Sequence, residues 1–163
     1  MAKKEKEIIT NAMRILTREK IPFRHFSYTC DDFVDGIQTA DALGLPHELV
    51  YKTLVTVGAD RNHYVFVIPI EAELDMKKCA KSVGVKSVEM IHVKDLFALT
   101  GYVRGGCTSI GMKKPFVTRI DSSAEKQPEI YVSAGRVGAQ ILLSPQDLAA
   151  AAHAEFADLL MQA

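Results

Sequence analysis

The stretches YKTLVTV at residues 51–57 and HYVFVIPI at residues 63–70 decide the fold of this chain. Both are rich in valine, isoleucine, threonine and aromatic residues, the types that favour β-strands. The five residues between them, GADRN at 58–62, begin with glycine and are otherwise mostly polar, a length and composition that suit an antiparallel hairpin. We therefore predict that these two segments pair as neighbouring antiparallel strands.

Hydrophobic periodicity and turn residues outline the remaining elements. Helices are expected over residues 4–19, 38–44, 46–50 (a short turn), 74–83 and 93–99. Further strands are expected over residues 23–28, 86–90, 116–120, 129–133 and 139–143. Ser144 and Pro145 begin a last helix, which the alanine-rich tail continues to the end. This mixture with a hairpin predicts the α+β class, with a mixed or mostly antiparallel sheet, in a single domain over residues 1–163.

The helix predicted over residues 74–83 is amphipathic. Its spacing turns Met76, Cys79, Ala80 and Val83 toward a core and the lysines outward. Such a charge run is commonly the solvated side of a helix.

Composition limits the classes of protein to which the chain can belong. At 163 residues and 48% hydrophobic, it can bury a core without disulfides or metals. No run approaches the roughly 18 apolar residues of a membrane helix. Cys30, Cys79 and Cys107 lie far apart, which argues against a disulfide framework and a zinc site. We expect a cytoplasmic protein with reduced thiols, no metal, no organic cofactor and no membrane partner.

The charges balance, because twenty Lys+Arg face twenty Asp+Glu. This balance argues against binding long nucleic acid by bulk electrostatics, although it leaves a local contact with RNA open.

Lys52 interrupts the first strand of the hairpin, where an ammonium group has to be desolvated. The segment GYVRGGCTSIG at residues 101–111 is a glycine-rich loop that can bring backbone N–H groups close to a ligand. Together a cation and an amide-rich loop indicate a site for a carbonyl or phosphate oxygen. Two structural alternatives stay open: a snorkelling or ion-paired lysine, and plain turn chemistry in the loop.

Cys107 lies within the glycine-rich loop. A thiol there is either a nucleophile of lowered pKa or a small apolar filler. The chain has no G-x-S-x-G segment and no H-E-x-x-H segment, which speaks against a serine hydrolase or a zinc peptidase.

Five blocks of sequence resemble the YbaK/EbsC family, the free-standing relatives of the bacterial prolyl-tRNA synthetase editing domain. Their order and spacing cover about residues 8–160. The blocks are VYKTL at 50–54, LDMKKCAK at 74–81, VEM at 88–90, GYVRGGCTSIGMKK at 101–114 and IYVS at 130–133. The resemblance implies a curved mixed β-sheet with packed helices. It also implies an activity, removal of a wrongly attached amino acid from the 3′ end of tRNA.

The resemblance also implies roles for individual residues. Lys52 matches the family's essential lysine, and we expect it to be the catalytic residue. The residues expected to bind the substrate are Tyr28, Gly105, Gly106, Cys107, Thr108, Gly111, Ser133, Gly135 and Gln140. We expect Lys113 and Lys114, beside the loop, to contact acceptor-stem phosphates.

Three positions depart from the family pattern. Thr108 replaces a serine and Ser109 replaces a proline. Loss of the proline frees the loop, with a wider pocket or weaker preorganisation as the expected result. Gln140 stands where YbaK carries an aspartate, so a role there that needs a carboxylate, such as binding an α-amino group, is open. The amino-acid preference is open for the same reason.

The function expected from the resemblance is a trans-editing aminoacyl-tRNA deacylase that removes cysteine from tRNA(Pro), working beside prolyl-tRNA synthetase. An aminoacyl ester is already activated, so the enzyme chiefly has to orient it and stabilise negative charge. The substrate's own thiol can serve as the nucleophile, giving a cyclic thioester and free tRNA. Two alternatives are a deacylase for another small amino acid such as alanine, and a non-catalytic binder of aminoacyl-tRNA ends or of the synthetase.

Overall fold

The computed structural model describes residues 9–27 and 36–161. The helices are α1 (Asn11–Arg18), α2 (Gly36–Leu43), α3 (Met76–Val83), α4 (Val93–Thr100) and α5 (Pro145–Ala152), with two 3₁₀ turns, η1 (His47–Leu49) and η2 (Ser122–Lys126). The strands are β1 (Arg24–Ser27), β2 (Tyr51–Gly58), β3 (His63–Pro69), β4 (Val88–Met90), β5 (Val117–Asp121), β6 (Ile130–Ser133), β7 (Ala139–Leu143) and β8 (Glu155–Ala157).

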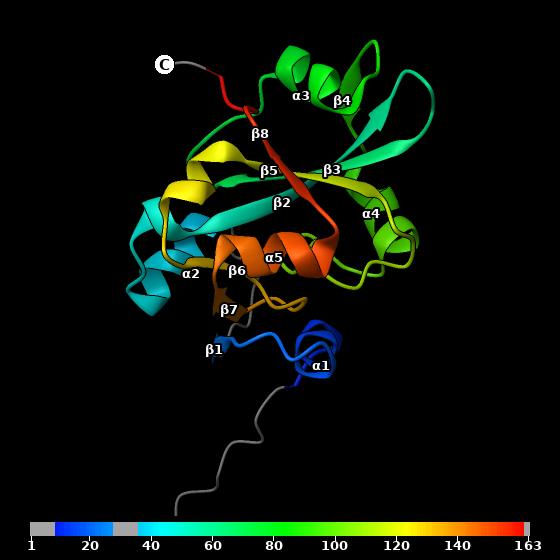
Figure 1. Cartoon of the computed structure of the whole chain (residues 1–163). Coiled ribbons are helices and arrows are strands. Elements are labelled where there is room, and N and C mark those ends of the chain that lie inside the picture. The colour runs from blue at the N-terminus through cyan, green and yellow to red at the C-terminus, as the bar shows by residue number, and fades with distance from the viewer. Residues whose placement is uncertain (1–8, 28–35, 162–163) are drawn as a thin grey trace, which may run out of the picture.

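The strands form two sheets (Figure 1). The larger has the order β4-β2-β3-β5-β8, with antiparallel pairs on both sides of β2 and parallel pairs on both sides of β5. The smaller has the order β1-β7-β6 and is antiparallel. The predicted α+β class with mixed and antiparallel pairing is confirmed, and the strands divide between two sheets.

The hairpin predicted from residues 51–70 is confirmed. β2 and β3 pair from Tyr51 opposite Pro69 to Val57 opposite His63. The turn is held by Asp60, whose carboxylate accepts hydrogen bonds from the Tyr64 hydroxyl at 2.6 Å and the Asn62 N–H at 3.0 Å.

Both faces of the larger sheet are covered (Figure 1). On one face, α3 packs its Cys79 and Ala80 against Phe66 and Ile68. On the other face, α1, α5 and the smaller sheet enclose the main core. Its members include Leu16, Tyr51, Val67, Ile130, Val132, Ile141 and Leu148. Burial of this apolar area is the principal stabilising term of the fold.

Capping residues fix where the helices begin. The first helix was predicted over residues 4–19, but α1 begins at Asn11 because the Thr10 hydroxyl accepts a hydrogen bond from the Met13 N–H at 3.3 Å and so caps it. Residues 1–8 lie outside the described ranges.

In α3, Cys79 and Ala80 are buried as predicted. The prediction was wrong for Met76, which is 37% exposed in the first turn, directly after the capping Asp75.

The prediction of a helix through the C-terminal tail was wrong. α5 begins at Pro145 as expected, but it ends at Ala152, where His153 takes a left-handed conformation (φ 53°). The tail then adds β8 beside β5 and buries Leu159, whose N–H donates to Asp121 at 3.0 Å. Packing of these apolar residues on the sheet overrides the helix propensity of the alanines.

None of the helices within residues 9–27 and 36–161 is long and apolar enough to cross a membrane.

Candidate functional site

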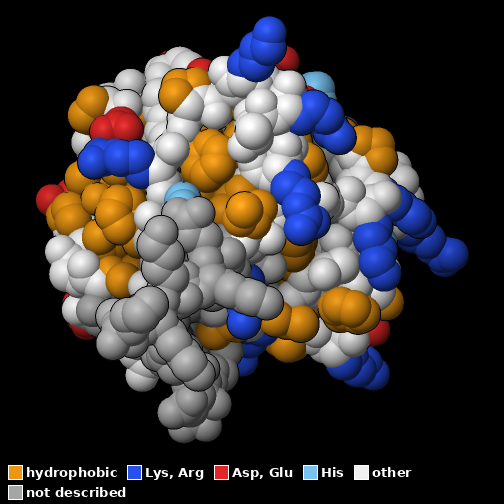
Figure 2. Space-filling model, turned by 90° about the horizontal axis from the view of Figure 1, so that it is seen from below, with side chains coloured by type: hydrophobic (Ala, Val, Ile, Leu, Met, Phe, Trp, Pro, Cys, Tyr) orange, Lys and Arg blue, Asp and Glu red, His pale blue; other side chains and the backbone are white. Residues whose placement is uncertain are grey.

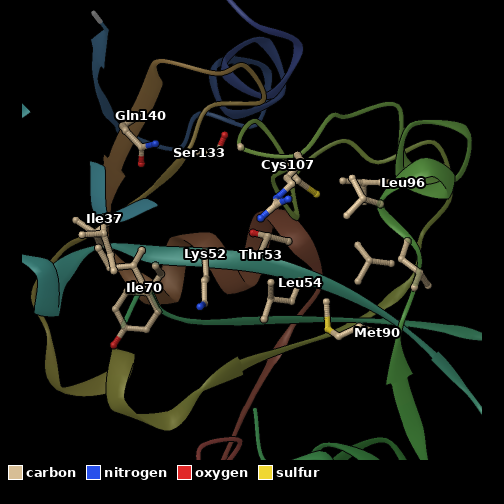
Figure 3. A pocket seen from close by; sticks show the side chains of 17 residues that line it. Ile37, Lys52, Thr53, Leu54, Ile70, Met90, Leu96, Cys107, Ser133 and Gln140 are labelled. Carbon is tan, nitrogen blue, oxygen red and sulfur yellow. The ribbon is translucent and has the colours of Figure 1, made fainter. Parts of the chain in front are cut away.

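A cavity of about 570 Å³ lies against the N-terminal half of β2 (Figure 3). Its walls are mostly apolar. Ile37 of α2 and Ile70 lie at one end, and Met90 of β4 and Leu96 of α4 at the other. Between them lie the polar residues Lys52, Thr53, Arg104, Ser133 and Gln140, with Gly105 and Cys107 of the glycine-rich loop. Such a concave apolar pocket with a few polar groups is typical of a small-molecule site.

The cavity lies where the described strands leave one edge of β2 open. β4 pairs only with residues 56–58 of β2, and the bridge between Val50 and Tyr131 precedes Lys52. Within the described ranges, no strand pairs with residues 52–54 on this edge.

The register of the hairpin shows which main-chain groups face this open edge. The bonds from Ile70 N–H to Val50 C=O (3.0 Å) and from Gly58 N–H to Asn62 C=O (2.8 Å) lie at the two ends of the hairpin, and in both an even-numbered residue on the β2 side bonds toward β3. Odd-numbered residues therefore direct their N–H and C=O groups to the other edge. The bond from Ile91 N–H to Val55 C=O agrees with this alternation. The N–H and C=O of Thr53 thus point toward the cavity that Thr53 lines.

Lys52 is half-buried and lines the cavity, and its catalytic role stays a prediction. Alternation along β2 turns Lys52 and Leu54 to one side of the strand and Thr53 to the other, the side on which Cys107, Ser133 and Gln140 lie (Figure 3). The cavity extends around the open edge of β2 and so reaches both sides. A ligand that contacts both Lys52 and the glycine-rich loop has to lie across this edge.

The glycine-rich loop presents part of itself to the cavity. Gly105 and Cys107 line the wall, whereas Gly106 is buried against the turn after β6. A Cβ atom on Gly106 would lie 2.8 Å from the N atom of Val137 and 2.9 Å from the carbonyl carbon of Arg136. Glycine is therefore required at 106 for close approach of two backbone segments.

Three further residues of the loop do not line this cavity, and two of them, Thr108 and Gly111, were predicted to bind the substrate. Thr108 is fully buried, Ser109 is 8% exposed, and Gly111 lies in a different hollow beside α1. The buried hydroxyl of Tyr102 donates a hydrogen bond of 2.5 Å to the Ile110 carbonyl and so holds this part of the loop. Burial raises the pKa of Tyr102 to about 12, which keeps the hydroxyl protonated as a donor.

The second loop meets the cavity through Ser133. The Ser133 hydroxyl accepts a hydrogen bond from the Gly135 N–H at 3.1 Å, which stabilises the turn. Gly135 itself has φ +96°, and a Cβ atom there would lie 2.9 Å from the ring of Tyr102. The structure thus gives Gly135 a place in loop packing and leaves Ser133 facing the cavity.

Gln140 lines the cavity and is 6% exposed. Its Oε1 atom is buried and accepts no hydrogen bond from the described part of the chain. A buried acceptor without a partner costs about 1–3 kcal/mol, and in a native protein it calls for an explanation. A donor on a bound ligand would supply one.

Cys107 is 8% exposed and packs with Val55 and Val65. Burial raises the pKa of its thiol to about 12, outweighing the lowering effect of a hydrogen bond with Thr100. The thiolate is the nucleophilic form, so the raised pKa favours the apolar-filler interpretation over the nucleophile.

The remaining predicted site residues lie away from the cavity or cannot be placed. Lys113 and Lys114 are exposed after the loop, and neither lines the cavity. Tyr28 lies outside the described residues. Among the described residues, no group of three or more His, Cys, Asp and Glu side chains could hold a metal ion.

Thr53 and Arg104 line the cavity, but the sequence did not single them out. Arg104 lies inside the quoted glycine-rich segment, so a charged residue within that loop was the available signal. The sequence carries no signal for Thr53, because its N–H and C=O face the cavity only where β4 does not pair with β2, and the sequence does not show how far β4 extends. The apolar walls from α2, β4 and α4 likewise depend on how these elements pack.

Comparison with known proteins identifies the family to which the chain belongs. Residues 34–151 match the family model of the aminoacyl-tRNA editing domain. EbsC of Enterococcus faecalis, named as a candidate Cys-tRNA(Pro)/Cys-tRNA(Cys) deacylase, is 44% identical over 160 residues, which are 98% of each chain.

Solved structures share the fold. A crystal structure of a candidate trans-editing enzyme for prolyl-tRNA synthetase has a TM-score of 0.79 at 22% identity and covers 95% of this chain and 100% of its own. A crystal structure of a hypothetical protein has a TM-score of 0.82 at 22% identity, with coverage of 91% and 97%. The resemblance read from the sequence is confirmed by the family model and by EbsC, and this chain belongs to the aminoacyl-tRNA editing domain family.

Proposed function

We propose that this protein is an aminoacyl-tRNA deacylase that removes cysteine from mischarged tRNA(Pro). The observation that carries the proposal is the cavity at the open edge of β2, which places a lysine beside main-chain donors in an apolar pocket. The family and the name of the 44%-identical EbsC support the same activity.

The ester of the substrate lies across the open edge of β2 in this proposal. The Lys52 ammonium group and the Thr53 N–H then act as donors to the ester carbonyl oxygen. Negative charge develops on this oxygen when the carbonyl carbon is attacked. Preorganised donors in a water-poor pocket stabilise that charge, and removing one such donor typically slows an enzyme by about 10²–10³-fold.

The substrate supplies its own nucleophile in the proposed mechanism. Of the described residues that line the cavity, none is a histidine, aspartate or glutamate, and the thiol of Cys107 stays protonated. The cysteinyl sulfur attacks its own ester carbonyl, forming a C–S bond while the C–O bond to the ribose breaks. The thiol proton passes to the leaving 3′-terminal hydroxyl, and the products are a cyclic thioester and uncharged tRNA.

Gln140 and Ser133 are proposed to orient the amino acid. The buried Oε1 of Gln140 accepts a hydrogen bond from the α-ammonium group or from the thiol, which removes the cost of its missing partner. Because the amide is neutral, it provides this contact without a full ion pair. The predicted roles of Gly105 in binding and of Tyr28 in lining the pocket remain predictions.

Selection of the tRNA is proposed to come from prolyl-tRNA synthetase, beside which the protein acts in trans. A cavity of this size and a chain of balanced charge suit recognition of the aminoacyl end better than recognition of a whole tRNA.

The proposal is tested by deacylation of tRNA(Pro) charged with cysteine, serine, alanine or proline, with and without prolyl-tRNA synthetase. Serine is the matched control, because it replaces the sulfur by oxygen at almost the same size. Loss of cysteine alone supports the substrate-thiol mechanism, and loss of cysteine and serine together indicates attack by water.

Two other outcomes decide between the alternatives. Preferential loss of alanine would replace the cysteine assignment by a deacylase for another small amino acid. Failure to clear any species, combined with tight binding of the charged tRNA end, would identify a non-catalytic binder.

A further inference from the structure

Exposed apolar side chains gather at the Met90 and Leu96 end of the cavity. Val93 is 57% exposed, Phe97 is 59% exposed, and Met90 and Val103 are also exposed. Met90 and Val93 line the cavity as well, so the exposed patch is continuous with the candidate site. A contiguous exposed apolar patch commonly marks an interaction surface.

α4 connects this patch to the cavity. Its Leu96 is half-buried, lines the cavity, and packs with Val55, Val65 and Cys107. Phe97 follows Val93 by four residues, so the two side chains lie on the same face, about 6 Å apart along the axis. The ring of Phe97 thus stands one helical turn beyond the cavity wall.

Lys113 is held against this ring. Its Nζ atom lies 5.1 Å from the centre of the Phe97 ring, a distance typical of a cation–π contact. The aliphatic stem of Lys113 passes close to Gly101. A Cβ atom added at Gly101 would lie 3.4 Å from the Cγ of Lys113. A main-chain hydrogen bond also holds Lys113 beside the end of α4, because the Lys113 N–H donates to the Thr100 carbonyl at 3.1 Å.

The charges around α4 are sorted by side. Asp95 and Glu89 line a separate hollow with His63 and His92, on the other side of the helix. The side that carries Phe97 has Lys113 against it. The face seen from below in Figure 2 carries Lys and Arg side chains over its right-hand half, the half on which Figure 1 places α4, with few acidic side chains among them.

We propose that Phe97 and Lys113 form a platform for the 3′-terminal adenosine of the aminoacyl-tRNA; this rests on the proposed function. An amino acid held in the cavity by its ester places the attached ribose and base at the cavity mouth. Single-stranded nucleotides are bound by aromatic side chains that stack on the base and by cations that meet the phosphates. The ring of Phe97 stacks on the adenine, and Lys113 meets the terminal phosphate.

The test measures binding of two stable probes to the full chain. One is an adenosine whose 3′ hydroxyl is replaced by a cysteinyl amide, and the other is cysteine methylamide, which lacks the nucleoside. We expect Phe97→Ala to weaken binding of the adenosine probe about 5- to 150-fold, the range for one stacked base, and to leave the methylamide unchanged. Phe97→Tyr, which keeps the ring, retains wild-type binding of both.

Three results would overturn the platform. Equal binding of the adenosine probe by wild type and Phe97→Ala would show that the ring does not contact the base. If the variant binds both probes normally but is no longer stimulated by prolyl-tRNA synthetase, the patch contacts a protein. If wild type binds neither probe, the proposed function fails and the platform with it, which distinguishes the two failures.

Discussion

Gly106 offers a sharp test of how the two loops build the cavity. A methyl group added by Gly106→Ala would lie 2.8 Å from the N atom of Val137, against 3.4 Å for ordinary contact. The backbone of one loop therefore has to move by about 0.6 Å, because both groups in contact belong to main chain. Such overpacking typically costs about 1–3 kcal/mol of folding free energy.

The same shift alters the site. Gly105 and Cys107 flank Gly106 and line the cavity, so moving this loop displaces one wall relative to Ser133. A misplacement of about 1 Å can cost about 10²-fold in rate, so a shift of about 0.6 Å is expected to slow deacylation about 10-fold. The melting temperature should fall by about 2–4 °C for each kcal/mol of folding free energy lost, as for chains of about this length.

Gly84→Ala is the matched control for stability. Gly84 ends α3 with φ +72° and has no atom within 4 Å of an added Cβ, so the substitution strains the backbone by about 1–2 kcal/mol without a clash. Neither the residue nor its helix lines the cavity. Equal loss of activity in both variants, or a Gly106→Ala protein with wild-type stability and rate, would refute the packing argument.

Three further predictions concern single side chains. Cys107→Ala should deacylate at the wild-type rate, because the buried thiol is not a nucleophile; a loss of 10²-fold or more in single-turnover assays would contradict this. Gln140→Leu should stabilise the free protein by about 1–3 kcal/mol in denaturant titrations, because it removes a buried acceptor that has no partner among the described residues, while raising the KM for cysteinyl-tRNA; a destabilised variant with unchanged KM would contradict it. Hydrogen bonds to Glu71 and then Asp41 raise the pKa of His47 above 6.5, so the stabilisation by this histidine is complete below pH 6.5 and is lost as the pH rises through the folded pKa. His47→Gln should therefore flatten the dependence of the melting temperature on pH between pH 6 and pH 9. An unchanged profile would show that these hydrogen bonds do not stabilise the fold.

The sequence predicted those parts of the fold that local chemistry determines. The strand-forming residues of 51–57 and 63–70, with the turn between them, predict the hairpin, and Ser144 with Pro145 predicts the start of α5. The C-terminal strand β8 was not predictable in the same way, because its pairing with β5 and the burial of Leu159 are long-range.

In the candidate site too, features set by local sequence were predictable and features set by long-range packing were not. Lys52 was identifiable as a cation in an apolar strand, and the structure places it in the cavity. The composition of the glycine-rich loop predicts ligand-facing amides, but Gly106 packs closely against a second loop and Gly111 lies in a different hollow. Composition alone does not distinguish these uses of glycine, since both require the absence of a side chain. The open edge at Thr53 was hidden because it depends on how far β4 extends.

In the proposed mechanism, Lys52 is the cationic donor to the ester carbonyl. The decisive measurement is the single-turnover rate of cysteinyl-tRNA(Pro) deacylation by wild type, Lys52→Met and Lys52→Arg, with thermal unfolding of each as the control for folding. Lys52→Met keeps the apolar stem and removes the charge, so we predict a loss of about 10²–10³-fold, with partial activity in Lys52→Arg. A folded Lys52→Met protein that clears cysteine at the wild-type rate would show that the Lys52 ammonium group does not stabilise the reacting ester.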